Sequence, residues 1–210
     1  MLSYEEALSL LHCYGKDAAW IRHCCAVSRV AERLSKAFPP NDPFDAEFFR
    51  VGALLHDIGR YKTHDPVMHG VEGYHLLMGL GHDREAFVCA SHVFCGMPRA
   101  ESVRYGLPDQ DFLPRTLEER LVPLIDSMVE LDRPTKLEQR MLSINRRYQC
   151  NAPFLERMQQ AAATARRLLD EVNRDLGISL ERVAAETLSR DESEQRSVST
   201  RGEQEHEQEG

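Results

Sequence analysis

The adjacent residues His56 and Asp57 are the part of this sequence best suited to chemistry. They lie in an apolar run of helical character, LLHDIGR at residues 54–60. Successive side chains of a helix point about 100° apart, so this imidazole and this carboxylate can reach one ion together. Burying both costs free energy unless they are paired or bind a metal. An isolated pair more often satisfies itself in a core helix, so a metal site requires further ligands.

Four further candidate ligands lie near the apolar side of other predicted helices. They are three imidazoles and a carboxylate: His23, His69, His92 and Asp126. Apolar residues surround Asp126 in the sequence, where a carboxylate requires a cation or a hydrogen-bond donor. Imidazole and carboxylate ligands suit divalent Mn, Fe, Co, Ni or Zn. The six residues together indicate a metal site more specifically than any one of them does.

A centre with two such ions favours hydrolysis of a phosphoester. Ions about 3.5–4 Å apart can generate hydroxide at neutral pH and hold the attacking and leaving oxygens. Arg60 and Lys62 closely follow the His-Asp pair and are the predicted phosphate-binding residues, although cations at a helix end often only complement the helix dipole. His64, on the loop that follows, is predicted as general acid or substrate contact, and the alternative is a solvated loop residue.

Helical periodicity predicts the elements that position these residues. Capping boxes at residues 3–6 and 116–119 mark two helix starts, and Gly59 is expected to end the helix that carries the His-Asp pair. No segment alternates as strands do, so we expect an all-α helical bundle with the metal site in its interior. The predicted helices cover about residues 4–13, 17–38, 45–58, 69–80, 83–92, 116–128, 134–147 and 153–176, with a short one after Ser179.

Two segments have other expected roles. The stretch 96–115 is rich in Gly, Pro, Asp and Arg and has no clear period, so we expect a lid or border of the pocket. The apolar stripe of the helix 153–176 is expected to be core or the seam of a homodimer rather than part of a cofactor site.

The composition describes one globular domain followed by a tail. With 210 residues, 42% of them hydrophobic, the chain can bury a core, and we place the domain at residues 1–188 with its metal-binding part at about 20–130. Residues 189–210 are rich in Ser, Glu, Gln and Arg and are expected to form a disordered acidic tail. The six cysteines show no CxxC spacing, so neither a zinc ribbon nor a disulfide framework is indicated.

Charge and hydropathy limit the expected partners. The net charge of −8 argues against a nucleic-acid polymer and leaves small anionic substrates open. The sequence has no signal-peptide pattern and no apolar run long enough for a bilayer, so we expect no membrane partner and a cytoplasmic location.

The order and context of the candidate ligands resemble the HD superfamily of metal-dependent phosphohydrolases. The resemblance covers about residues 20–130, and LLHDIGR is its most specific block. It implies a first metal site made of four residues, His23, His56, Asp57 and Asp126. It also implies that Asp57 bridges to a second ion held by His69 and His92. The run HGVEGYHLL at 69–77 resembles the helix that carries the extra histidine in two-metal members.

The resemblance implies a reaction class but no particular substrate. The chain looks most like small uncharacterised archaeal and bacterial HDIG proteins, and it lacks the Gly-Tyr-Pro segment of the cyclic-dinucleotide phosphodiesterases. We therefore expect a hydrolase of a small phosphoester, such as a nucleotide or related phosphate, in which Asp57 is essential for catalysis. One alternative is a mixed-valence di-iron oxygenase of the same fold. The other is a non-catalytic nucleotide-sensing module whose metal is structural or absent.

Overall fold

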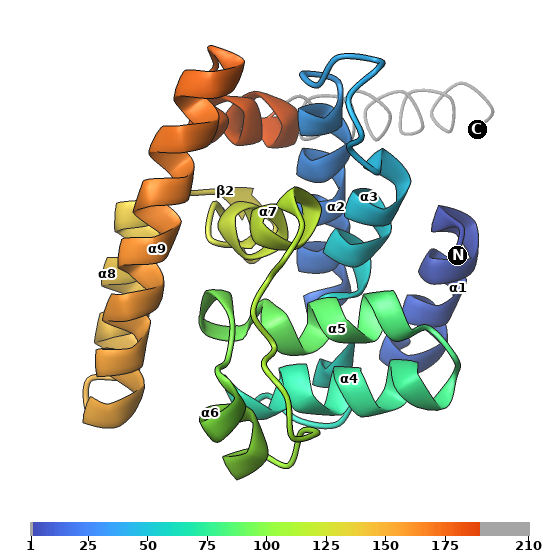
Figure 1. The fold of residues 1–210 in the computed structure, drawn as a ribbon, viewed down its shortest axis with the longest axis vertical. Helices are drawn as coiled ribbons and strands as arrows, with labels where there is room; N and C mark the ends of the chain where they lie inside the picture. The colour runs from blue at the N-terminus through green and yellow to red at the C-terminus, as the bar shows by residue number, and fades with distance from the viewer. Residues whose placement is uncertain (1, 190–210) are drawn as a thin grey trace, which may run out of the picture.

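The chain folds as a bundle of α-helices, as the sequence predicts (Figure 1). The computed structural model describes residues 2–189. Within them, no helix combines the length and the apolar character needed to cross a membrane. The helices are α1 (Tyr4–Gly15), α2 (Trp20–Ser35), α3 (Ala46–Leu55), α4 (Met68–Gly79), α5 (Asp83–Ser91), α6 (Arg99–Arg104), α7 (Leu117–Asp126), α8 (Leu137–Arg147) and α9 (Ala152–Leu176), with a further helix at 180–189.

Helix α3 is central because both of its sides are buried. It packs against α2, α7, α5 and α1. Phe48 and Phe49 belong to a core shared with α2, α7 and α9, whereas Leu54 and Leu55 belong to a second core shared with α1, α4 and α5. A helix that is apolar all round must be enclosed by other elements. The residues that follow α3 therefore emerge in the interior of the bundle.

Three of the predicted helix ends are confirmed by their capping residues. Both capping boxes form, with the Ser3 and Thr116 hydroxyls accepting from the backbone N–H three residues later. Gly177 ends α9 in the left-handed conformation, as a glycine after the last helical residue predicts.

The expectation for the end of α3 is wrong. The helix ends at Leu55 rather than at Ile58, and a short 3-10 helix, η1 (Ile58–Tyr61), contains Gly59. A Cβ atom on Gly59 would lie 1.9 Å from the carbonyl oxygen of His69 on α4. This glycine therefore allows η1 to pack directly on α4, and it does not serve as a left-handed helix cap.

The sequence did not predict two short strands and the short helix α6. An antiparallel hairpin pairs β1 (Val129–Glu130) with β2 (Arg133–Pro134), and two residues are too few to show an alternating pattern. The stretch 96–115, expected to be a lid or border of the pocket rather than core, instead contributes residues to the core. It contains α6 and a bridge between Met97 and Phe112, both fully buried.

The C-terminal helices form a hairpin along one side of the bundle. Helix α9 packs against α8 and against α7. Figure 1 shows α8 and α9 at the side of the bundle opposite α1. The predicted tail lies outside the described residues except for Ser189, which continues the last helix. The disorder expected of that tail stays a prediction.

Candidate metal centre

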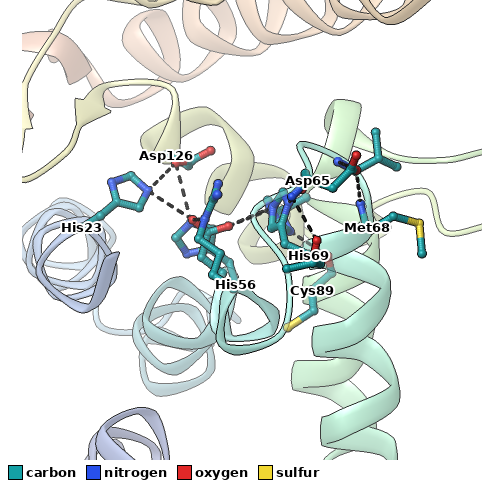
Figure 2. A network of polar contacts seen from close by, with 12 residues as sticks. His23, His56, Asp65, Met68, His69, Cys89 and Asp126 are labelled. Carbon is teal, nitrogen blue, oxygen red and sulfur yellow. Dashed lines mark hydrogen bonds and ion pairs between the residues drawn. The ribbon is translucent and has the colours of Figure 1, made fainter. Parts of the chain in front are cut away.

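The structure brings all six predicted metal ligands together in the bundle interior. Figure 2 labels His23, His56, His69 and Asp126 among them. Five of the side chains are buried, and that of Asp126 is 24% exposed. They come from five segments of the chain: His23 from α2, His56 and Asp57 from the junction of α3 with η1, His69 from α4, His92 from the end of α5 and Asp126 from the end of α7.

Asp57 is the centre of this arrangement because each of its oxygens faces a different pair of imidazoles. Oδ1 lies 2.9 Å from Nε2 of His69 and 3.6 Å from Nε2 of His92. Oδ2 lies 3.7 Å from Nε2 of His56 and 3.8 Å from Nε2 of His23. The ligands thus form two groups that share one carboxylate.

Asp126 joins the first of these groups. Its Oδ1 lies 2.9 Å from Nε2 of His23 and 3.6 Å from Nε2 of His56. The first group therefore offers two imidazoles and two carboxylates, and the second offers two imidazoles and the shared carboxylate. These are the donor types that a divalent transition metal takes.

Backbone carbonyls fix the orientation of all four imidazoles. Each Nδ1 lies within hydrogen-bond distance of a carbonyl oxygen, which only accepts, so each Nδ1 carries a proton. The other ring nitrogen, Nε2, then points toward Asp57, and outer contacts of this kind orient metal-binding histidines. The contacts are His23 with Leu131 at 2.8 Å, His56 with Ala53 at 2.8 Å, His69 with Asp65 at 2.8 Å and His92 with Cys89 at 2.7 Å.

The arrangement of Nε2 atoms fits a bound cation. Nε2 of His56 is buried and has no hydrogen-bond partner among the described residues. Nε2 of His69 and Nε2 of His92 are only 3.1 Å apart. In neutral rings with Nδ1 protonated, both atoms present lone pairs, and two facing lone pairs are favourable only with a cation or proton between them.

Burial and charge put Asp57, Asp126 and His92 in states suited to metal binding. Burial opposes ionisation of Asp57, but nearby His56, His69 and Arg60 outweigh it and hold the pKa of Asp57 well below its usual value. Burial also opposes ionisation of Asp126, but the neighbouring His23 and His56 imidazoles outweigh it and hold the pKa of Asp126 well below its usual value. Burial lowers the pKa of His92, which keeps that ring neutral. Both carboxylates and this imidazole are therefore in the forms that bind a metal.

The three predicted substrate or proton-transfer residues take different positions. Arg60 lies beside the ligands and donates from Nε to Oδ2 of Asp57. His64 is exposed and lines a cavity together with His23 and Arg60. Lys62 is 57% exposed and pairs with Glu72 at 2.7 Å, so the structure does not bring it into this group.

A cavity of about 130 Å³ lies between the candidate ligands and the C-terminal hairpin. Asp57, His69, His92 and Asp126 form part of its wall. Helices α8 and α9 supply much of the rest: Arg140, Met141, Ile144, Arg147, Phe154, Met158, Ala161, Ala162 and Ala165. The stripe on α9 belongs to the core, as one of the two expectations for it stated, and part of it also borders this cavity.

The chain belongs to the HD domain family, whose model matches residues 20–131. That range includes all six candidate ligands and ends before α8 and α9. A curated relative from Methanocaldococcus jannaschii, an uncharacterised protein, is 34% identical over 159 residues, which are 75% of this chain and 93% of the relative. No solved structure matches the chain.

Two further relatives are named tRNA (cytidine(56)-2'-O)-methyltransferase. The one from Picrophilus torridus is 31% identical over 82% of this chain and 50% of its own length. The one from Thermoplasma volcanium is 33% identical over 64% of this chain and 39% of its own length. The matching region is thus no more than half of either named methyltransferase.

Proposed function

We propose that this protein is a phosphohydrolase that acts on a small phosphoester through a binuclear His/Asp metal centre. The observation that carries the proposal is the position of Asp57. Its two oxygens face two separate pairs of imidazole nitrogens, and backbone carbonyls hold those four rings with Nε2 pointing inward. A carboxylate shared between two such groups is the ligand that a pair of ions requires.

Bound divalent ions would polarise the phosphoryl oxygens and lower the pKa of a bound water. Hydrolysis then joins the water oxygen to phosphorus and breaks the bond from phosphorus to the ester oxygen, which leaves with a proton. Asp57 would contribute a ligand to both metal positions, and Asp126 would complete the first. We assign the terminal nitrogens of Arg60 to a phosphate oxygen of the substrate, because Arg60 uses Nε for its hydrogen bond to Asp57. We assign proton donation to His64, which lines the adjoining cavity.

Lys62 remains a predicted phosphate contact with less support. Its Nζ already contacts Glu72, so binding a phosphate near the ligands would require this exposed side chain to leave that ion pair. The expectations of a small phosphorylated partner, no nucleic-acid polymer and a possible homodimer also stay predictions.

The names of the two methyltransferase relatives do not carry over to this chain. The methyltransferase relatives match over half of their length or less, so we do not propose methyl transfer.

The oxygenase alternative uses the same ligand types, and the sensing-module alternative uses the same fold, so both remain outcomes of the experiment below.

The test is metal analysis followed by an activity panel. Purified protein is stripped, reloaded separately with Mn, Fe, Co, Ni or Zn, and assayed for phosphate release from nucleotides and generic phosphoesters. We expect about two ions per chain and phosphate release that His56→Gln abolishes. Oxygen consumption by the iron form without phosphate release would favour the oxygenase. Bound nucleotide without turnover in any metal form would favour the sensing module.

A further inference from the structure

Two arginines on α8 lie where two cavities meet beside the candidate metal centre. The first cavity runs along α9, and the second, of about 190 Å³, is lined by residues of α2 and the β-hairpin. Both cavities are lined by Asp57, Arg60, Arg140 and Arg147. The two arginines are seven residues apart on one helix, so they lie two turns apart on the same side.

Glu130 on the hairpin holds both arginines. Its Oε1 lies 3.2 Å from Nη1 of Arg140 and 3.4 Å from Nη2 of Arg147, and it accepts a hydrogen bond from Oγ of Ser143 at 2.5 Å. This hydroxyl, together with Arg140 and Arg147, lowers the pKa of Glu130, so the carboxylate is charged at neutral pH. One carboxylate balances only one of the two guanidinium groups.

The two guanidinium groups differ in their access to solvent. The side chain of Arg140 is only 16% exposed, and that of Arg147 is 54% exposed. A guanidinium removed from water requires compensation by an anion, and its planar donors match a phosphate. Asp57 and Asp126 also line the cavity, but the metal ions of the proposed function would bind these two carboxylates.

The cavity wall opposite the ligands is apolar. Phe154, Met158, Ala161 and Ala165 line it from α9, and the alanines leave room for a ligand beside the helix. A pocket with cations at one side and apolar side chains at another fits a ligand with an anionic group and a carbon skeleton.

We propose that Arg140 and Arg147 bind a second phosphate of the substrate, while its carbon skeleton lies against α9. This inference rests on the proposed function for the first phosphate, which lies at the metal centre. The substrate class is therefore a small bisphosphate in which an apolar or aromatic spacer separates two phosphate groups. The residues that select it lie on α8 and α9, outside the region that the HD family model matches.

The experiment uses α,ω-alkanediol bisphosphates of increasing length, each compared with the alkyl monophosphate of the same length. For metal-loaded wild type we expect kcat/KM to be at least about tenfold higher for the best bisphosphate than for its monophosphate, as charge-assisted contacts predict. In Arg140→Met and Arg147→Met, the loss on the bisphosphate should exceed the loss on the monophosphate at least fivefold. Arg140→Lys, which keeps the charge without the planar fork, should lie between.

The matched control is Arg146→Met, on the same helix and with the same change of charge. Arg146 is exposed and is not among the residues that line the two cavities. This variant should keep the wild-type preference for the bisphosphate. Equal losses on both substrates in Arg140→Met and Arg147→Met, or no preference in the wild type, would overturn the inference.

A binding measurement separates this inference from the proposed hydrolysis. An alkane bisphosphonate, which cannot be hydrolysed, is titrated into metal-loaded protein by calorimetry. Arginine-dependent binding without hydrolysis of any ester would support the second-phosphate site and contradict the proposed function. If the protein hydrolyses monophosphates but its affinity for the bisphosphonate is the same in the Arg140 and Arg147 variants as in wild type, the proposed function is supported and the second-phosphate site is contradicted.

Discussion

Replacing Gly59 by alanine should disturb the metal centre without touching any ligand. A Cβ atom at this position would lie 1.9 Å from the carbonyl oxygen of His69 and 2.4 Å from the backbone nitrogen of Gly73. Real Cβ atoms essentially never approach closer than 3.0 Å, so η1 and α4 must separate by about 1.1 Å or more. Both atoms are backbone atoms, so no flexible side chain can move aside to relieve the contact.

That displacement is large compared with the tolerance of a metal site. Ligand distances must be correct to about 0.2 Å for a metal to be held well. Asp57 lies two residues before Gly59, and its Oδ1 contacts Nε2 of His69 across the same interface at 2.9 Å. We therefore expect Gly59→Ala to weaken metal binding by Asp57, His69 and His92 by about tenfold to a hundredfold. This is the loss in metal affinity that follows when a residue that orients a ligand is removed.

The fold should also lose stability, by about 1–3 kcal/mol for an overpacked core site. For a domain of this size, that corresponds to a fall of about 2–12 °C in melting temperature. The assay measures ions per chain by mass spectrometry after dialysis at fixed free metal, together with thermal unfolding of the metal-free and metal-loaded forms.

The matched control is Gly79→Ala in α4. No atom lies within 4 Å of a Cβ built there, so alanine should be neutral or stabilise the helix by up to about 1 kcal/mol. If Gly59→Ala fails to fold, Gly73→Ala supplies a milder case, because its Cβ would lie 3.1 Å from the Cys89 side chain. Wild-type metal affinity in Gly59→Ala would refute the reasoning.

Four further measurements test other parts of the argument. Asp57→Ala should lower kcat by at least about three powers of ten and remove bound metal, since its oxygens face both imidazole pairs; activity within a few-fold of wild type would place the site elsewhere. Arg60→Ala should lower kcat/KM by roughly ten- to hundredfold with metal retained, and loss of metal would instead make Arg60 a support for Asp57. Because the pKa of Glu130 is lower in the folded protein than its usual value of 4.5, this carboxylate stabilises the fold above pH 4.5, and the stabilisation is lost as the pH falls through the pKa of the folded state. The melting temperature of the wild type should therefore fall more steeply in that pH range than that of Glu130→Gln. Parallel curves of melting temperature against pH would contradict this. Truncation after Leu188 should leave the melting temperature and activity unchanged, and a drop of several degrees would show that the removed segment docks.

The sequence predicted the fold class and the convergence of ligands because both depend on local patterns. Apolar spacing of four and three residues defines helices, and a polar side chain beside such a stripe points toward the interior. The HD pattern then adds which of these side chains meet, and the structure brings together the same six residues.

The walls of the cavity could not be predicted in the same way. The stripe on α9 looks identical whether it packs on another helix or borders a cavity, since both surroundings favour apolar residues. In the sequence, Arg140 and Arg147 resemble ordinary surface cations. In the fold, the β1–β2 hairpin places Glu130 next to both of them. Their spacing of seven residues puts the two arginines on one side of α8, but it does not show what that side faces. The hairpin itself is too short to leave a periodic signal.

The orientation of two ligands follows from a local rule that the sequence does contain. His56 and His92 each follow the last residue of a helix and donate from Nδ1 to the carbonyl oxygen three residues earlier, at Ala53 and Cys89. The last carbonyls of a helix lack partners within it, so an imidazole at this position satisfies one of them. The same hydrogen bond fixes the tautomer and turns Nε2 toward Asp57. Helix termination and metal-ligand orientation are thus one interaction at these two positions. A ligand on a helix end gains this orientation without a separate outer residue, which explains how the metal centre can be built largely from backbone contacts within the bundle.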